Sequence, residues 1–141
     1  MKPDKHITAS LIISSAVYFY FKSWTAFFVS FLAGVFIDVD HLLDYFMQQG
    51  LTFKIARVYH WFSEHKYKYI WIFLHSIELM VILWVAIYVF KLGLFWIALA
   101  IGFTQHLILD IFFNRNFIYW YAYFLAYRFL KGFKRAYISS V

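Results

Sequence analysis

Four short clusters of ionisable side chains interrupt an otherwise apolar chain of 141 residues. They comprise His6; Asp38, Asp40 and His41; His75 and Glu78; and His106 and Asp110. Charged and imidazole groups are expensive within apolar segments, so their placement there indicates a function. Imidazole and carboxylate are the side chains left to bind a transition metal in this chain, because it contains no cysteine.

The spacing inside the clusters is that of neighbours on a helix. Three pairs are three or four residues apart, namely Asp38 with His41, His75 with Glu78, and His106 with Asp110. Side chains at these spacings share one helix face and can point at a common centre. The pattern therefore predicts a site for a divalent metal, zinc above all, with one or two ions.

We expect all eight ionisable groups to take part in this site. The predicted metal ligands are His6, Asp38, Asp40, His41, His75, Glu78, His106 and Asp110. Asp40 or Glu78 would also orient or deprotonate an attacking water, as a general base does. The alternative from the residues alone is a set of buried ion pairs that holds no metal.

The composition predicts an all-α integral membrane protein. Hydrophobic residues make up 65% of the chain and charged residues 14%, against about 25% charged residues in a typical soluble domain. The length favours a single domain, residues 1–141. Apolar runs predict a bundle of four transmembrane helices at about residues 5–21, 24–40, 70–90 and 94–113.

Two further segments are expected at the membrane interface. Residues 42–69 interleave charged and aromatic side chains, which is typical of an amphipathic interfacial segment. Residues 117–130 are rich in tyrosine and also contain Arg128. Such aromatic residues favour the interface, so we expect an amphipathic C-terminal helix that is interfacial or half-inserted.

Distances along the chain place the four clusters at one membrane face. Tight turns are expected at Lys22 and Lys91, and each cluster lies roughly 20–27 Å from one of them at 1.5 Å per residue. All of the 13 Lys and Arg residues except Lys22 and Lys91 fall at the end where the clusters lie. The positive-inside rule makes this end cytoplasmic, together with both termini.

The clusters resemble those of the YdjM-like family, LexA-regulated membrane-bound metal-dependent hydrolases of the inner membrane. The matching stretches lie between residues 6 and 110 and comprise His6, Ile37 to His41, Leu74 to Ser76, and Gly102 to Asp110. The pattern is similar, more distantly, to zinc-dependent phospholipase C and P1 nuclease. The resemblance implies a helical metal-binding hydrolase of the prokaryotic plasma membrane.

Two positions depart from the pattern of that family. Ile37 stands where the family has a proline, and Ile70 stands where it has a histidine. Glu78 and His65 are the candidates to replace the ligand that Ile70 lacks, and the alternative is a site with fewer metals than in that family, or one without catalytic competence.

These features together predict hydrolysis of a phosphoester in a lipid or lipid-linked substrate by a metal-activated water. Membrane lipids are the expected partners, and anionic head groups would be attracted by Lys54, Arg57, Lys66, Lys68 and Arg115. The net charge of +6 is assigned to topology and lipid contact rather than to nucleic acid. The alternative is a non-catalytic membrane protein that conducts ions or protons, or one that binds a partner protein.

Overall fold

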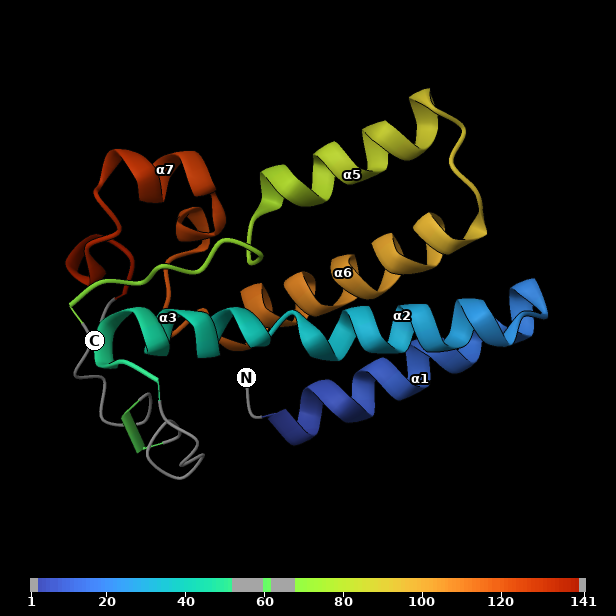
Figure 1. The fold of residues 1–141 in the computed structure, drawn as a ribbon, viewed down its shortest axis with the longest axis horizontal. Coiled ribbons are helices and arrows are strands. Elements are labelled where there is room, and N and C mark those ends of the chain that lie inside the picture. The colour runs from blue at the N-terminus through green and yellow to red at the C-terminus, as the bar shows by residue number, and fades with distance from the viewer. Residues whose placement is uncertain (1–2, 52–59, 62–67, 140–141) are drawn as a thin grey trace.

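The computed structural model describes residues 3–51, 60–61 and 68–139. Its elements are helices, shown in Figure 1. They are α1 (Pro3–Phe21), α2 (Trp24–Phe36), α3 (Val39–Gln49), α5 (Ile77–Val89), α6 (Leu94–Phe113), η1 (Trp120–Tyr123), α7 (Leu125–Leu130) and η2 (Arg135–Tyr137). Within the described ranges, extended pairing is limited to isolated bridges of Tyr69 with Lys134 and Ile118 with Ser139. The predicted all-α class is confirmed.

Short turns join α1 to α2 and α5 to α6. Lys22 and Lys91 adopt left-handed φ angles of 52° and 51°, which reverse the chain within a few residues. The side chains of Ser23 and Ser76 cap α2 and α5, each accepting a hydrogen bond of 3.2 Å from the backbone amide three residues on. Both turns lie at one end of the molecule, and the start of α1 and helix α7 lie toward the other (Figure 1).

Helices α2 and α6 cross closely because glycine lies at their contact. A methyl group at Gly102 on α6 would collide with the backbone carbonyl of Ser30 on α2. A methyl group at Gly34 would lie 2.5 Å from the hydroxyl of Ser10 on α1. Small residues let helix backbones approach in this way. The crossing brings Gly34 beside His106.

The interior of the α1–α2–α6 bundle changes character along its length. Near the turns it is apolar, and it consists there of Val17, Ala26 and Ala98. Toward the other end it becomes polar, with Ser10, Ser14, Ser30 and Gln105. The Ser30 hydroxyl donates to Ser14 Oγ at 2.9 Å, and the Ser10 hydroxyl donates to Gln105 Oε1 at 3.1 Å. Hydrogen bonding between side chains thus allows these groups to be buried.

Among the described residues, two helical segments, rather than the predicted four, are long and apolar enough to cross a membrane. One is Trp24–Gln49, in which α2 and α3 follow each other through a turn, and the other is α6. Helix α5 is apolar but has 13 residues, about 20 Å at 1.5 Å per residue and short of a hydrocarbon core of about 30 Å. Helix α1 has 19 residues, but its first turns are polar.

The predicted span at 70–90 begins as a helix only at Ile77, because side chains of α3 hold the preceding residues extended. The Asp40 carboxylate accepts a hydrogen bond from Leu74 N at 2.6 Å, and the Asp44 carboxylate accepts one from Trp71 N at 3.0 Å. Both carboxylates are buried, each with 1% exposure. These contacts replace the backbone hydrogen bonds that a helix would make.

The two predicted interfacial segments also differ from the expectation. The region 42–69 starts inside α3, which continues to Gln49, and its residues 52–59 and 62–67 lie outside the described residues. The region 117–130 contains η1 followed by α7 rather than one helix. Tyr123 and Arg128 of this region are buried. Arg128 donates to the backbone carbonyls of Ile72 and His75, before α5, and the Tyr123 hydroxyl lies 3.5 Å from Asn114 Nδ2.

Candidate metal centre

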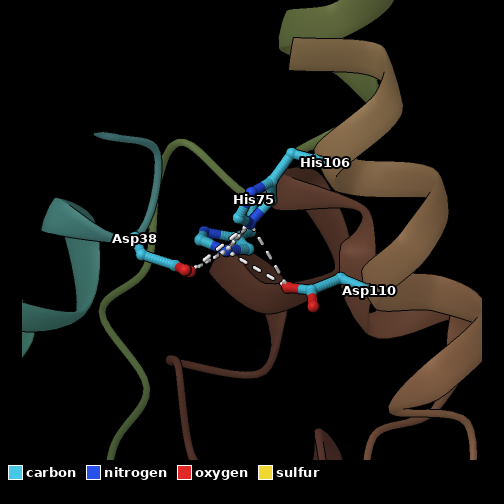
Figure 2. A group of neighbouring side chains, drawn as sticks. All are labelled: Asp38, His75, His106 and Asp110. Atoms are coloured by element: carbon cyan, nitrogen blue, oxygen red, sulfur yellow. Dashed lines mark hydrogen bonds and ion pairs between the residues drawn. The ribbon is translucent and has the colours of Figure 1, made fainter. Parts of the chain in front are cut away.

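Four side chains meet at the end of the bundle opposite the turns (Figure 2). Asp38 comes from the turn between α2 and α3, His75 precedes α5, and His106 and Asp110 lie on α6. One ligand atom from each lies within 4.8 Å of all the others, and the three side chains other than Asp38 are buried. We call Asp38, His75, His106 and Asp110 the four-ligand group; it could hold a metal ion.

The distances within the four-ligand group suit a single four-coordinate ion. His75 Nε2 lies 3.3 Å from His106 Nε2, 3.5 Å from Asp38 Oδ1 and 3.3 Å from Asp110 Oδ2. His106 Nε2 lies 3.4 Å and 3.7 Å from the same two oxygens. A tetrahedron with metal–ligand bonds of about 2.1 Å has edges of roughly 3.4 Å. These five separations are close to that edge length, so the group could hold one divalent ion.

Contacts from α1 and α2 orient His106 and Asp110. His106 Nδ1 lies 2.7 Å from the carbonyl oxygen of Gly34, so this nitrogen carries the proton and Nε2 is left for a metal. The ring of His6 stacks on the ring of His106 with 4.2 Å between centroids. His6 Nε2 also lies 3.0 Å from Asp110 Oδ1. Such outer contacts hold metal ligands in position and tune their affinity.

Asp40 and His41 lie on the other side of His75. Asp40 Oδ2, which binds the amide of Leu74, lies 3.6 Å from His75 Nδ1. The ring of His41 meets the ring of His75 edge-on at 4.9 Å, and His41 Nε2 lies 3.9 Å from Asp38 Oδ1. The structure therefore places both residues beside the four-ligand group, in contact with its members.

Glu78 lies apart from the four-ligand group. Its carboxylate accepts hydrogen bonds from the amides of Leu125 at 2.8 Å and Ala126 at 2.9 Å, and from Ser76 Oγ at 2.8 Å. The two amides belong to the first turn of α7, where a carboxylate is favourable. Glu78 therefore attaches α7 to the start of α5. Ile70 is buried in an apolar cluster, and His65 lies outside the described residues.

Arg128 is buried, although it belongs to the segment 117–130 that the sequence predicts at the membrane interface. It is 1% exposed, and its guanidinium donates to the carbonyl of Ile72 and, at 2.6 Å, to the carbonyl of His75. Burial lowers the pKa of Arg128, yet a guanidinium remains protonated in proteins. The signal available in the sequence was one charged residue in the run from Phe117 to Leu130.

The charge of His75 predicts the pH dependence of metal binding. Burial disfavours its protonated form, but Asp110, Asp38 and Asp40 outweigh burial and raise the pKa of His75 to about 10. At neutral pH a metal must therefore displace a proton from His75. We expect zinc to bind more weakly as the pH falls, roughly tenfold per pH unit for each proton released. Calorimetry in buffers of different ionisation enthalpy counts these protons, and binding without proton release would contradict the prediction.

Seven of the eight predicted site residues thus lie together. They are the four-ligand group with His6, Asp40 and His41 around it. The geometry offers one ion a complete set of ligands and leaves Asp38 and His41 about one third exposed, with 34% for each side chain. Comparisons of the chain with protein-family models, curated proteins and solved structures find no match.

Proposed function

We propose that the protein is a membrane-embedded, metal-dependent hydrolase that cleaves a phosphoester in a lipid or lipid-linked substrate. The observation that supports this most is the four-ligand group, with spacings suited to zinc at the end of an apolar helical bundle. Carboxylates and imidazoles in this number are costly in such a bundle unless they neutralise one another or a cation. The YdjM-like resemblance leads to the same class of protein.

A bound divalent ion would supply a Lewis acid and, with a water as a ligand additional to the four side chains, a nucleophile of lowered pKa. The side chains around the ion would bind it, admit the substrate and accept a proton. His75, His106, Asp38 and Asp110 hold the ion, and the partly exposed edge formed by Asp38 and His41 admits substrate. His41 has an Nε2 atom 3.9 Å from Asp38 Oδ1, which suits it to take a proton from a water between them. Asp40 Oδ2 lies 3.6 Å from His75 Nδ1, the ring nitrogen that does not face the ion, and would hold the imidazole in place.

The proposal includes a place in the prokaryotic plasma membrane. Large apolar side chains of the two long helical segments face outward, as lipid contact requires; they include Trp24, Phe28, Phe36, Phe95 and Phe112. Lys22 and Lys91 lie at the two turns, and the remaining basic residues belong to segments at the opposite end or outside the described residues. By the positive-inside rule this puts the site and both termini on the cytoplasmic side.

The interior of the bundle favours hydrolysis over ion conduction. In the described helices, the buried polar side chains extend from His6 to Ser14 and Ser30. Val17, Ala26 and Ala98 close the interior beyond them. A conduction path would need polar groups or water through this apolar end as well. The arrangement fits a site that is reached from one face.

Metal analysis and a lipid phosphoesterase assay test the proposal together. Purified protein is expected to carry about one zinc ion per chain, because the four-ligand group is complete with one. Chelation should abolish phosphoester cleavage, and added zinc should restore it. His106→Ala should lose both the metal and the activity. Folded wild-type protein that binds no divalent metal would refute the proposal.

A further inference from the structure

A small cavity adjoins the four-ligand group on the side of α7. Its volume is about 40 Å³. His75 and Asp110 line it on one side, and Asn114, Tyr123 and Arg128 contribute its other polar wall. One buried water needs roughly 10–15 Å³ of space for its centre, so the cavity has room for roughly three waters. That room is close to what the oxygens of one phosphoryl group occupy.

Arg128 brings a buried positive charge to this cavity. Two of its nitrogens donate to the neutral carbonyls of Ile72 and His75. Its Nε is buried and finds no acceptor among the described residues. No carboxylate in the described part of the chain forms an ion pair with it. The carboxylates of Asp40 and Glu78 favour its charge from a distance, and the donors that remain on the guanidinium, Nε among them, suit phosphate oxygens.

Two further polar groups face the same space. Asn114 Nδ2 donates to Asp110 Oδ1 at 2.9 Å and lies 3.5 Å from the Tyr123 hydroxyl oxygen. Burial, together with the Asp110 carboxylate, raises the pKa of Tyr123, so its hydroxyl keeps a proton that it can donate. His41 also lines the cavity, and the rest of its wall is apolar and consists of Ile70, Ile72, Ile118, Ala122 and Ile138. Apolar walls exclude water and strengthen contacts between charges.

We propose that this cavity is the subsite for the phosphoryl group of the substrate, with Arg128 and Tyr123 binding its oxygens. This inference rests on the proposed function, because the cavity borders the ligands of the proposed metal. The carboxylates Asp38 and Asp110 would repel an anion until a cation lies between them. Anion binding should therefore require bound metal, and each should strengthen the other.

Cobalt-loaded protein in nanodiscs of digalactosyldiacylglycerol, a lipid without phosphate, provides the test, since the visible spectrum of cobalt reports changes beside the metal. Inorganic phosphate should change this spectrum in a saturable way in the wild-type protein. Arg128→Met should raise the phosphate concentration needed for half-saturation roughly tenfold or more, because charge-assisted hydrogen bonds are lost. Wild type and variant are compared at saturating cobalt, because Arg128 also donates to the carbonyl of His75 and its loss would affect that ligand. Arg128→Lys keeps the charge, so its phosphate concentration for half-saturation should lie between those of the wild type and Arg128→Met.

Lys134→Met is the matched control, because it removes one positive charge from an exposed position near the C-terminus of the described chain. It should respond to phosphate as the wild-type protein does. Nanodiscs that also contain phosphatidic acid separate the two sources of the phosphoryl group. If inorganic phosphate changes the spectrum, a soluble anion is sufficient to occupy the subsite. If phosphatidic acid changes it and inorganic phosphate does not, the subsite requires a lipid head group. Either response supports the subsite if Arg128→Met loses it.

The outcomes separate this inference from the proposed function. Wild-type protein that binds no cobalt would overturn both. If both proteins bind cobalt and Arg128→Met responds to phosphate as the wild type does, the subsite alone is overturned. The same conclusion follows if the cobalt-loaded wild-type protein responds neither to inorganic phosphate nor to phosphatidic acid. If Arg128→Met does not fold, Tyr123→Phe serves as the second variant, because it removes one hydrogen-bond donor. It should raise the phosphate concentration needed for half-saturation roughly threefold to tenfold. An unchanged value in Tyr123→Phe would then contradict the inference.

Discussion

Replacing Asp110 with asparagine should weaken zinc binding by more than about 100-fold, since loss of an outer contact alone costs 10–100-fold. Asp110 contributes twice to the centre. Its Oδ2 lies 3.3 Å from His75 Nε2 and 3.7 Å from His106 Nε2. Its Oδ1 lies 3.0 Å from His6 Nε2. Asparagine keeps the size of the side chain but removes the charge that an ion and the histidines require.

Competition with a chromophoric chelator measures this effect at fixed pH, and circular dichroism checks that the helices persist. Asp4→Asn is the matched control, because Asp4 lies in the first turn of α1 and is exposed. It should bind zinc with wild-type affinity. An Asp110→Asn protein with the affinity of Asp4→Asn would show that Asp110 is not a ligand.

Replacing Gly102 with alanine should destabilise the protein by about 1–3 kcal/mol, the usual cost of overpacking a close contact. The added methyl group would collide with the backbone carbonyl of Ser30 and lie 3.0 Å from the backbone nitrogen of Gly34. Backbone atoms cannot rotate away, so α2 and α6 would have to separate. That movement should lengthen the contact between Gly34 O and His106 Nδ1 and weaken metal binding as well.

Gly93→Ala is the control for this substitution. Gly93 has a φ of −72°, and a methyl group there would meet nothing within 4 Å. Its effect on the free energy of unfolding should stay within about 0.5 kcal/mol. Unfolding by denaturant in detergent compares the two variants. Equal stabilities for Gly102→Ala and Gly93→Ala would contradict the role assigned to the close crossing of α2 and α6.

The helical class and a centre that could hold a metal were both predictable from the sequence. The helical class follows because the long apolar runs leave few other ways to satisfy the backbone. The eight candidate ligands were recognisable because histidine and carboxylate side chains are rare inside apolar segments. Counting residues from the turns at Lys22 and Lys91 placed the four clusters at one depth. These inferences need only residue type and the rise of a helix.

The roles of Glu78 and Arg128 were decided by the tertiary structure. The spacing of His75 and Glu78 predicts a common face only if both lie in one helix, but His75 precedes the cap of α5 at Ser76, whose backbone is extended. Glu78 therefore points to α7 instead. Arg128 lies outside the four clusters in the sequence, yet it is bound to the backbone of His75.

The sequence by itself determined which ionisable groups lie at the same end of an apolar bundle, because depth along a helix depends on residue number alone. It could not determine which of those groups share one ion. That choice depends on how closely α2 and α6 approach at Gly102 and on the extended path before α5. Both depend on contacts between residues far apart in the chain, such as Asp40 with Leu74 and Gly34 with His106.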